Sequence, residues 1–275
     1  MSADLHIHTT FSDGSYKPEE IVDLAEKNNF KTIAISDHDT LDGINPALEY
    51  ASNKDIEVIP AIEFSTFEEK AEIHILGYFI DHEDDYLRKK VKKIFDSRKI
   101  RAQKMVELLN KQNIDITYNE VKNMAGDDYI GRPHIAKLMV KRGYINEMKD
   151  AFTDQYIGNG GKAYVEKYKL SPVEAIDLIL NTGGIPVLAH PVFINHGEPM
   201  DKQDIKKLKD TGLLGLEVYH SKHNEKTIGY YKNIAQELNL LITGGSDFHG
   251  ENSPGVNLGD IRLSDDHIDK LKGKI

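Results

Sequence analysis

The chain has 275 residues, of which 39% are hydrophobic and 29% charged, and its formal net charge is −10 with histidine counted as neutral. This acidic balance argues against a basic face that wraps duplex DNA, and the complete lack of cysteine excludes disulfides, thiolate metal sites and a cysteine nucleophile. Its apolar runs fall short of the ~20 residues that a membrane-spanning helix needs, and residues 1–11 do not resemble a signal peptide. We therefore expect a cytoplasmic protein without membrane contact.

The first third of the chain alternates between strand and helix signals. Residues 18–28 are predicted to form a helix because Pro18 suits its first turn and Ile21 and Leu24 recur with helical spacing. Residues 32–36 form a short apolar run, which is typical of a strand buried on both faces. Further strands are predicted at 3–8, 56–62 and 72–80, and a further helix at 44–53.

The middle of the chain carries helix signals instead. Residues 84–112 are predicted to form one long charged helix, whose buried side is marked by apolar residues at helical spacing. Shorter helical segments follow at 118–125, 132–142 and 147–157. We therefore expect residues 86–170 to form an all-helical insert.

The last third of the chain returns to alternation, and it completes an α/β fold. Strands are predicted at 183–191, 213–220 and 239–247, with helices at 201–210 and 224–238. Repeated β–α units imply parallel strands joined by right-handed crossovers. Six or seven predicted strands favour a (β/α) barrel smaller than eight-fold, formed by residues 1–85 and 171–275, with an open doubly wound sheet as the alternative.

Histidine and carboxylate side chains gather where the predicted strands end. In a barrel of parallel strands these ends converge on one mouth, so we expect the side chains to share one cavity. His6 and His8 are alternate residues of one strand and therefore point to the same side. Asp37 is expected to hold an imidazole by a hydrogen bond. The predicted ligands are His6, His8, Asp13, His38, Glu63, His74, His190, Asp247 and His249.

This residue set is typical of a centre with several metal ions. Imidazole and carboxylate together suit Mn, Fe and Zn, and several carboxylates in one pocket are costly unless cations neutralise them. Seven or more ligands exceed the needs of one ion, so two or three divalent ions are expected, with Glu63 placed to bridge two of them. Paired ions clamp the attacking and leaving oxygens of an in-line displacement. The pattern thus predicts a hydrolase, most naturally of phosphoesters.

Six short motifs in order resemble those of the PHP (polymerase and histidinol phosphatase) family. They are HIHTTFSDGS (6–15), SDHDT (36–40), IEF (62–64), IHILGY (73–78), LAHP (188–191) and GSDFH (245–249). The resemblance implies a distorted, TIM-like (β/α)7 barrel with two or three metal ions. It also implies three centres, formed by His6, His8, Glu63 and Asp247, by Glu63, His74 and His190, and by Asp13, His38 and His249.

Within this family the chain is most similar to the stand-alone, TrpH-like phosphoesterases, through residues 11–25, 36–44 and 131–136. This similarity implies removal of a phosphate from a nucleoside 3′,5′-bisphosphate, or trimming of short single-stranded RNA from its 5′ end. The expected nucleophile is a hydroxide that the metals bind and that Glu63, His190 and Asp247 hold.

Substrate contacts are predicted at a helix start in the insert. Arg132 offers a fork for phosphate and His134 lies one turn away, so both are expected to hold a second, non-reacting phosphate. His223 is a further candidate for substrate contact, with a structural role as its alternative. Residues 88–111 hold ten Lys/Arg and two acids, which predicts either a solvated face or a surface that steers polyanions.

Three alternative functions stay open. Histidinol-phosphate hydrolysis would use the same chemistry on a monophosphate and would leave Arg132 idle. Processive degradation of nucleic acid would need a groove that follows the strand. A non-catalytic, metal-dependent binding module belongs to another class, and the complete ligand set argues against it.

Overall fold

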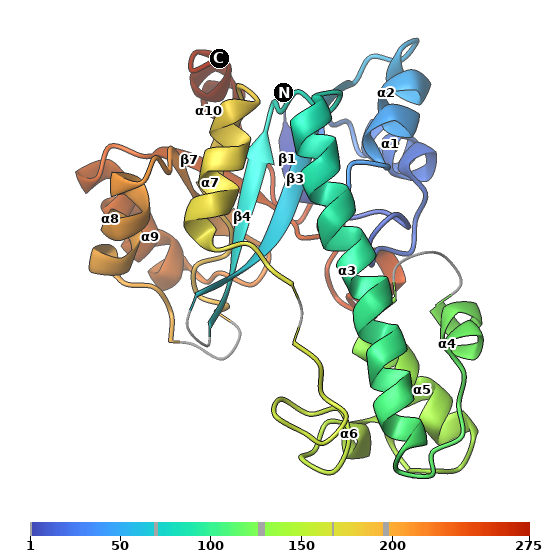
Figure 1. The fold of residues 1–275 in the computed structure, drawn as a ribbon. Helices are drawn as coiled ribbons and strands as arrows, with labels where there is room; N and C mark the ends of the chain where they lie inside the picture. Colours follow the sequence, from blue (N-terminus) through green and yellow to red (C-terminus); the bar gives the residue numbers. More distant parts are fainter. Residues whose placement is uncertain (1, 69–70, 126–129, 167, 195–197) are drawn as a thin grey trace. The chain divides into compact units, whose positions relative to one another are not determined.

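The computed structural model describes residues 2–68, 71–125, 130–166, 168–194 and 198–275, in which seven strands form one sheet in the order β1 to β7 (Figure 1). The segment after β7 returns to β1, because the Asp247 N–H donates to the His6 carbonyl at 2.9 Å and the His8 N–H donates to the Phe248 carbonyl at 3.0 Å. The sheet is therefore a nearly closed barrel, as predicted. Its strands are β1 (Ala3–Ile7), β2 (Thr32–Ile35), β3 (Glu57–Glu68), β4 (Ala71–Tyr78), β5 (Ile185–Leu188), β6 (Gly215–His220) and β7 (Leu241–Gly245).

Strand β4 breaks the parallel order that the repeated β–α units predicted. It runs antiparallel to both β3 and β5, whereas the other neighbouring pairs are parallel. Only residues 69–70 separate β3 from β4 in the sequence, which is too short for the crossover that a parallel pair needs. Because β4 runs the other way, residues near its beginning lie at the mouth where parallel strands end.

Strand β3 is longer than the predicted 56–62 because it pairs with a different neighbour in each half. Its first part, Glu57–Pro60, pairs with β2, and Ala61–Glu68 pairs with β4. Glu63 therefore lies inside a strand and not after one. Its position is fixed from two sides, by a parallel bridge to His38 and by pairing with Leu76.

Helices accompany the barrel strands. Among them, α7 and α10 were missed by the sequence prediction, although Ser171 and Glu174 form a capping box that marks the start of α7. Helices α1 and α2 pack on β1 and β2 through one buried apolar cluster that includes Ile7, Ile21 and Ile33. The barrel helices are α1 (Pro18–Lys27), α2 (Ile44–Ala51), α7 (Pro172–Asn181), α8 (Lys202–Asp210), α9 (Glu225–Glu237), α10 (Asp265–Lys272) and the 3-10 turn η1 (Gly250–Asn252).

The chain forms two compact units, Met1–Val91 with Lys169–Ile275, and Lys92–Tyr168. The first boundary lies within α3 (Asp85–Asn110), and not at the predicted residue 86, because the start of that helix belongs to the first unit, where Leu87 is fully buried. The second unit also contains α4 (Tyr118–Ala125), α5 (Arg132–Lys141) and α6 (Met148–Ala151).

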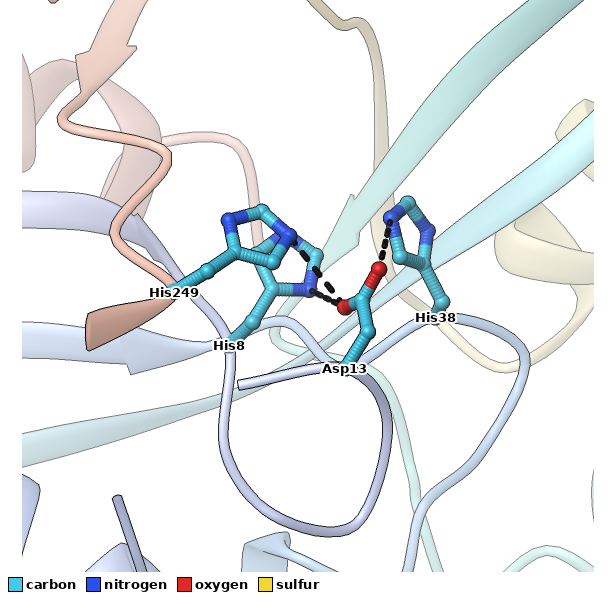
Figure 2. A group of neighbouring side chains, drawn as sticks. All are labelled: His8, Asp13, His38 and His249. Carbon is cyan, nitrogen blue, oxygen red and sulfur yellow. Dashed lines mark ion pairs between the residues drawn. The ribbon is translucent and has the colours of Figure 1, made fainter. Parts of the chain in front are cut away.

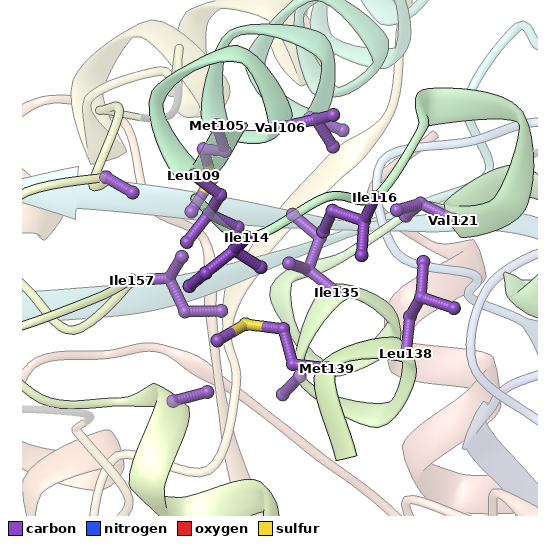
Figure 3. Packing of buried hydrophobic residues seen from close by; sticks show 14 of the residues in the cluster. Met105, Val106, Leu109, Ile114, Ile116, Val121, Ile135, Leu138, Met139 and Ile157 are labelled. Atoms are coloured by element: carbon purple, nitrogen blue, oxygen red, sulfur yellow. The ribbon is translucent and has the colours of Figure 1, made fainter. Parts of the chain in front are cut away.

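The second unit has its own apolar core (Figure 3), to which Met105, Leu109, Ile135 and Met139 contribute. The helix predicted at 147–157 ends early, because the Ile157 N–H donates to the Ala151 carbonyl at 2.9 Å and so closes a wide turn. No described helix is both long enough and apolar enough to cross a membrane.

A glycine in β7 allows the barrel to close against β1. A methyl group at Gly245 would lie 2.3 Å from the Cβ of His6 and 2.4 Å from its backbone nitrogen. We expect Gly245→Ala to lower the free energy of unfolding by about 1–3 kcal/mol, the usual cost of overpacking a core, as measured by urea denaturation.

The matched control is Gly229→Ala in α9, where a new methyl group meets no described atom within 4 Å. A helix-interior alanine should stabilise there by about 0.5–1 kcal/mol. Equal effects of the two substitutions would contradict the close approach.

Candidate metal centre

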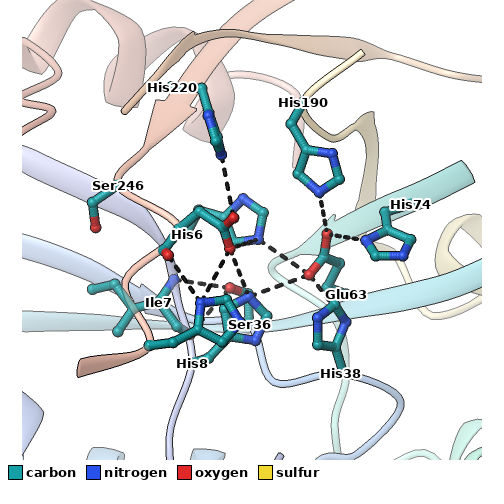
Figure 4. Close-up of polar contacts among 12 residues, drawn as sticks. His6, Ile7, His8, Ser36, His38, Glu63, His74, His190, His220 and Ser246 are labelled. Carbon is teal, nitrogen blue, oxygen red and sulfur yellow. Dashed lines mark hydrogen bonds and ion pairs between the residues drawn. The ribbon is translucent and has the colours of Figure 1, made fainter. Parts of the chain in front are cut away.

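The structure brings all nine predicted ligands together at one mouth of the barrel. Figure 4 shows His6, His8, His38, Glu63, His74 and His190, and Figure 2 adds Asp13 and His249. Most of them lie at or just after the end of a strand, whereas Glu63 lies within β3 and His74 lies in the first half of the antiparallel β4. Four overlapping groups of these residues hold their ligand atoms within 4.8 Å of one another. The groups are His8, Asp13, His38 and His249; His6, Glu63 and His190; His6, His8 and Asp247; and His38, Glu63 and His74.

The Glu63 carboxylate is the common centre of the site. One oxygen, Oε1, lies 2.9 Å from His74 Nδ1 and 3.0 Å from His190 Nε2. The other oxygen, Oε2, lies 3.1–3.2 Å from a ring nitrogen of each of His6, His8 and His38. Burial alone would raise the pKa of Glu63, but the surrounding imidazoles hold this pKa well below its usual range. A buried carboxylate that faces two sets of imidazoles can be shared by two cations.

Asp247 supplies a second carboxylate to the same site. Its Oδ1 lies 3.3 Å from His8 Nε2 and 3.5 Å from His6 Nε2, and its Oδ2 lies 3.3 Å from His220 Nε2. The backbone φ of Asp247 is 57° and that of His190 is 22°, a region that non-glycine residues rarely adopt. Such strain persists only where surrounding contacts impose it, and it is concentrated at functional sites.

Asp13 gathers a further group of imidazoles (Figure 2). Its Oδ1 lies 3.2 Å from His249 Nε2 and 3.7 Å from His8 Nδ1, and its Oδ2 lies 3.8 Å from His38 Nε2. His8 therefore belongs to two groups, because its two ring nitrogens face different carboxylates. The family resemblance assigned His8 to only one of them.

The donor atoms of this mouth fit divalent metal ions. Several are buried and have no hydrogen-bond partner among the described residues, including His6 Nε2, both ring nitrogens of His8, His38 Nδ1 and Glu63 Oε2. Buried polar atoms are rarely left unsatisfied, and cations would satisfy these. Nitrogen and carboxylate donors suit Mn, Fe and Zn alike, so the donor set fits the cofactor class and leaves the element open.

Asp37 does not hold an imidazole, contrary to the prediction. Its carboxylate accepts hydrogen bonds from the Thr9 N–H and hydroxyl, both at 2.7 Å, and from the Ser12 hydroxyl at 2.5 Å. Asp37 therefore fixes the loop that follows β1 and carries Asp13. Sequence spacing could not distinguish this role, because Asp37 adjoins His38 along the chain.

Two residues of β6 contribute to the site without having been predicted as ligands or partners. Glu217 contacts His6, and His220 contacts Asp247. A charged residue within the apolar run of residues 213–220 was the signal that could have identified Glu217, because burial of a carboxylate requires partners.

Arg132 and His134 lie in the second unit, at the start of α5. An Nη1–H of Arg132 donates to the Ile157 carbonyl at 3.2 Å and to Asn159 Oδ1 at 2.8 Å. Arg132 also lines a cavity of this unit together with Arg98 and Arg101. His134 Nδ1 accepts the Gly131 N–H at 3.0 Å, and burial lowers the pKa of this imidazole.

His223 lies in the first unit, beside Phe193. Its Nδ1 is 2.9 Å from the Val218 carbonyl, and its ring stacks on that of Phe193 with centroids 5.9 Å apart. The Nε2 atom is buried from solvent. The Nδ1 contact fits the structural alternative, whereas Nε2 has no hydrogen-bond partner among the described residues, so both alternatives for His223 stay open.

Comparison with known proteins gives three informative similarities. The family model described as the PHP domain matches residues 4–170. The chain is 33% identical over 258 residues to the 5′-3′ exoribonuclease Rnm of Escherichia coli, covering 93% of this chain and 87% of the relative. It is 28% identical over 257 residues to the 3′,5′-nucleoside bisphosphate phosphatase of Chromobacterium violaceum, covering 93% and 90%.

A solved structure resembles the whole chain. It is that of a predicted metal-dependent phosphoesterase from Bifidobacterium adolescentis, with a TM-score of 0.83 and 30% sequence identity. The alignment covers 99% of this chain and 96% of the other.

Proposed function

The chain belongs to the PHP-domain family and is a metal-dependent hydrolase of phosphate esters, and on this basis we propose that its substrate is a nucleoside 3′,5′-bisphosphate. The metal chemistry rests on the Glu63 carboxylate, which is buried among five imidazoles at 2.9–3.2 Å, and the choice of substrate is supported by the similarity to a 3′,5′-nucleoside bisphosphate phosphatase. Within the second unit, Arg98, Arg101 and Arg132 line one cavity, and guanidinium groups of this kind suit a phosphate.

We assign the nine predicted residues as the ligands of two or three divalent ions. Bound here, such ions would polarise phosphoryl oxygens and lower the pKa of coordinated water. Glu63 would be shared between ions, and the positive φ of His190 and Asp247 supports their role as ligands held in place by the fold. The three centres that the family resemblance implies stay part of this proposal: His6, His8, Glu63 and Asp247; Glu63, His74 and His190; and Asp13, His38 and His249. The second has the support of Glu63 Oε1, which lies 2.9 Å from His74 and 3.0 Å from His190, although the groups of ligand atoms within 4.8 Å divide the nine residues differently.

Arg132 and His134 are proposed to bind the non-reacting phosphate. Because His134 Nδ1 accepts a backbone N–H, its Nε2 carries the proton of the neutral ring and can donate to a phosphate oxygen. Arg132 has one nitrogen engaged with protein acceptors, which leaves donors on the rest of the guanidinium fork. These contacts would orient a bisphosphate more strongly than a monophosphate.

The test is a phosphate-release assay on a nucleoside 3′,5′-bisphosphate, the 3′- and 5′-monophosphates, histidinol phosphate and short RNA. We expect Arg132→Ala to lower kcat/KM for the bisphosphate about 10–100-fold, the value of lost hydrogen bonds to a charged group, and to change the monophosphates little. Arg142→Ala removes a guanidinium from the other end of the same helix, where it pairs with Glu120, and should leave all rates unchanged. Equal losses on every substrate would refute the selectivity of Arg132.

Trimming of short RNA is the second candidate, favoured by the similarity to an exoribonuclease. In that case the rate on oligonucleotides should exceed the rate on mononucleotides and fall steeply with salt. A highest kcat/KM on histidinol phosphate would instead support the monophosphatase, and no release from any substrate in the presence of Mn²⁺ would support a binding module.

A further inference from the structure

We propose that Glu217 and His220 of β6 are positioning residues of the metal centre, and that Glu217 selects the ring nitrogen that His6 presents to a metal. This inference rests on the metal site of the proposed function and not on its substrate. Strand β6 carries none of the nine predicted ligands, yet both residues are almost completely buried at 0% and 1% exposure.

Glu217 holds two ligand-bearing segments at once. Its Oε1 lies 2.9 Å from His6 Nδ1, and its Oε2 accepts the His190 backbone N–H at 2.7 Å. The first contact orients the His6 ring of β1, and the second fixes the backbone of His190, whose φ is 22°. One carboxylate thus links ligands from opposite sides of Glu63, since His6 faces Glu63 Oε2 and His190 faces Oε1.

An irregularity in β6 allows His220 to join Glu217. Glu217 pairs with Thr243, but Tyr219 pairs with Gly244, so the register shifts by one residue between them. Side chains normally alternate along a strand, and the extra residue turns His220 to the same side as Glu217. His220 Nδ1 accepts the Lys222 N–H at 3.2 Å, so its Nε2–H can donate to Asp247 Oδ2 at 3.3 Å. Asp247 Oδ1 is left facing His6 and His8.

The chemical consequence concerns the tautomer of His6. When Nδ1 donates its proton to a carboxylate, Nε2 keeps the lone pair that a metal needs. His6 Nε2 is the atom that faces Glu63 and Asp247. In Glu217→Gln, the single amide oxygen can accept from His6 or from the His190 N–H, but not from both in the present geometry. If the NH₂ group faces His6, it donates to Nδ1 and the His6 proton moves to Nε2. If it faces the His190 N–H, two hydrogen-bond donors point at each other.

The experiment measures metal binding directly. Protein stripped with a chelator is titrated with Zn²⁺ against a chromophoric competitor, and bound metal is counted by elemental analysis. We expect Glu217→Gln to bind at least one ion about 10–100-fold more weakly, as for other residues that orient metal ligands. The control is Thr182→Val, which removes another buried polar group, a hydroxyl that donates to the Ile179 carbonyl at 2.8 Å at the end of α7. It should bind Zn²⁺ as the wild type does.

Two outcomes would overturn the proposal. One is a folded Glu217→Gln protein, judged by circular dichroism, with wild-type Zn²⁺ affinity and stoichiometry. The other comes from the wild-type protein and applies even if the variant does not fold. In its Zn²⁺-loaded form with ¹⁵N-labelled histidine, the His6 ring should carry its proton on Nδ1, and a proton on Nε2 would contradict the assignment. Because neither measurement uses a phosphoester, a wrong substrate would leave both results intact.

Discussion

Glu63→Gln is expected to lower the rate of phosphoester hydrolysis about a thousandfold and to reduce the number of bound metal ions. The substitution keeps the shape of the side chain but removes the negative charge that five imidazoles face. One of its two oxygens becomes an NH₂ group, which cannot bind a cation and would point either at His74 and His190 or at the other three rings. The loss of one shared ion removes several kcal/mol of transition-state stabilisation, which corresponds to about a thousandfold in rate.

The control for this prediction lies on the same strand. Glu68→Gln makes the identical chemical change at the exposed end of β3 and should leave activity and metal content unchanged. Both variants are compared by phosphate release at saturating Mn²⁺ and by elemental analysis of the purified protein. A Glu63→Gln enzyme with full metal content and activity within a few-fold of the wild type would show that Glu63 is not the shared ligand.

Local patterns were sufficient to place the predicted ligand side chains together because most of them lie at or just after strand ends, although Glu63 lies inside β3 and not after it. The alternation of His6 and His8, and the placement of Asp247 and His249 after β7, depend on strand periodicity and on the convergence of strands in a barrel. His74 was placed in the right strand but for an incomplete reason. It reaches the mouth because β4 is antiparallel, which depends on its pairing partners and not on its own residues.

The supporting contacts were less predictable for a related reason. The hydrogen-bond partners of Asp37 lie 25 and 28 residues away in the sequence, and those of Glu217 lie 27 and 211 residues away. Such distant partners come together only when the barrel closes. The side chain of His220 points inward because the register of β6 shifts by one residue. The alternation of side chains along a strand does not predict such a shift. Helix α7, in contrast, carries an ordinary capping box and was predictable from its own residues.

Metal removal is expected to lower the melting temperature, and this effect should grow as the pH rises from 6.5 to 8.5. Each ion present at a hundredfold excess over its Kd adds about 2.7 kcal/mol, which is roughly 5–10 °C for a domain of this size. In the metal-free protein, burial alone would lower the pKa of His8, but the nearby carboxylates of Asp247, Glu63 and Asp13 outweigh it and raise this pKa to about 10.

The direction of the pH dependence follows from this raised pKa. Protonated His8 stabilises the metal-free protein fully below the unfolded pKa of about 6.5, and this contribution is lost as the pH rises towards 10. A metal must displace the same proton, so metal affinity increases over the same interval. This single competition between proton and metal widens the difference in melting temperature between Mn²⁺-loaded and chelator-treated protein as the pH rises. The His8→Gln substitution should flatten this pH dependence. The control is His82→Gln, which should preserve it, because the ring of His82 contacts Asn45 at the surface. A difference that stays constant between pH 6.5 and 8.5 in the wild type would mean that no buried proton competes with the metal.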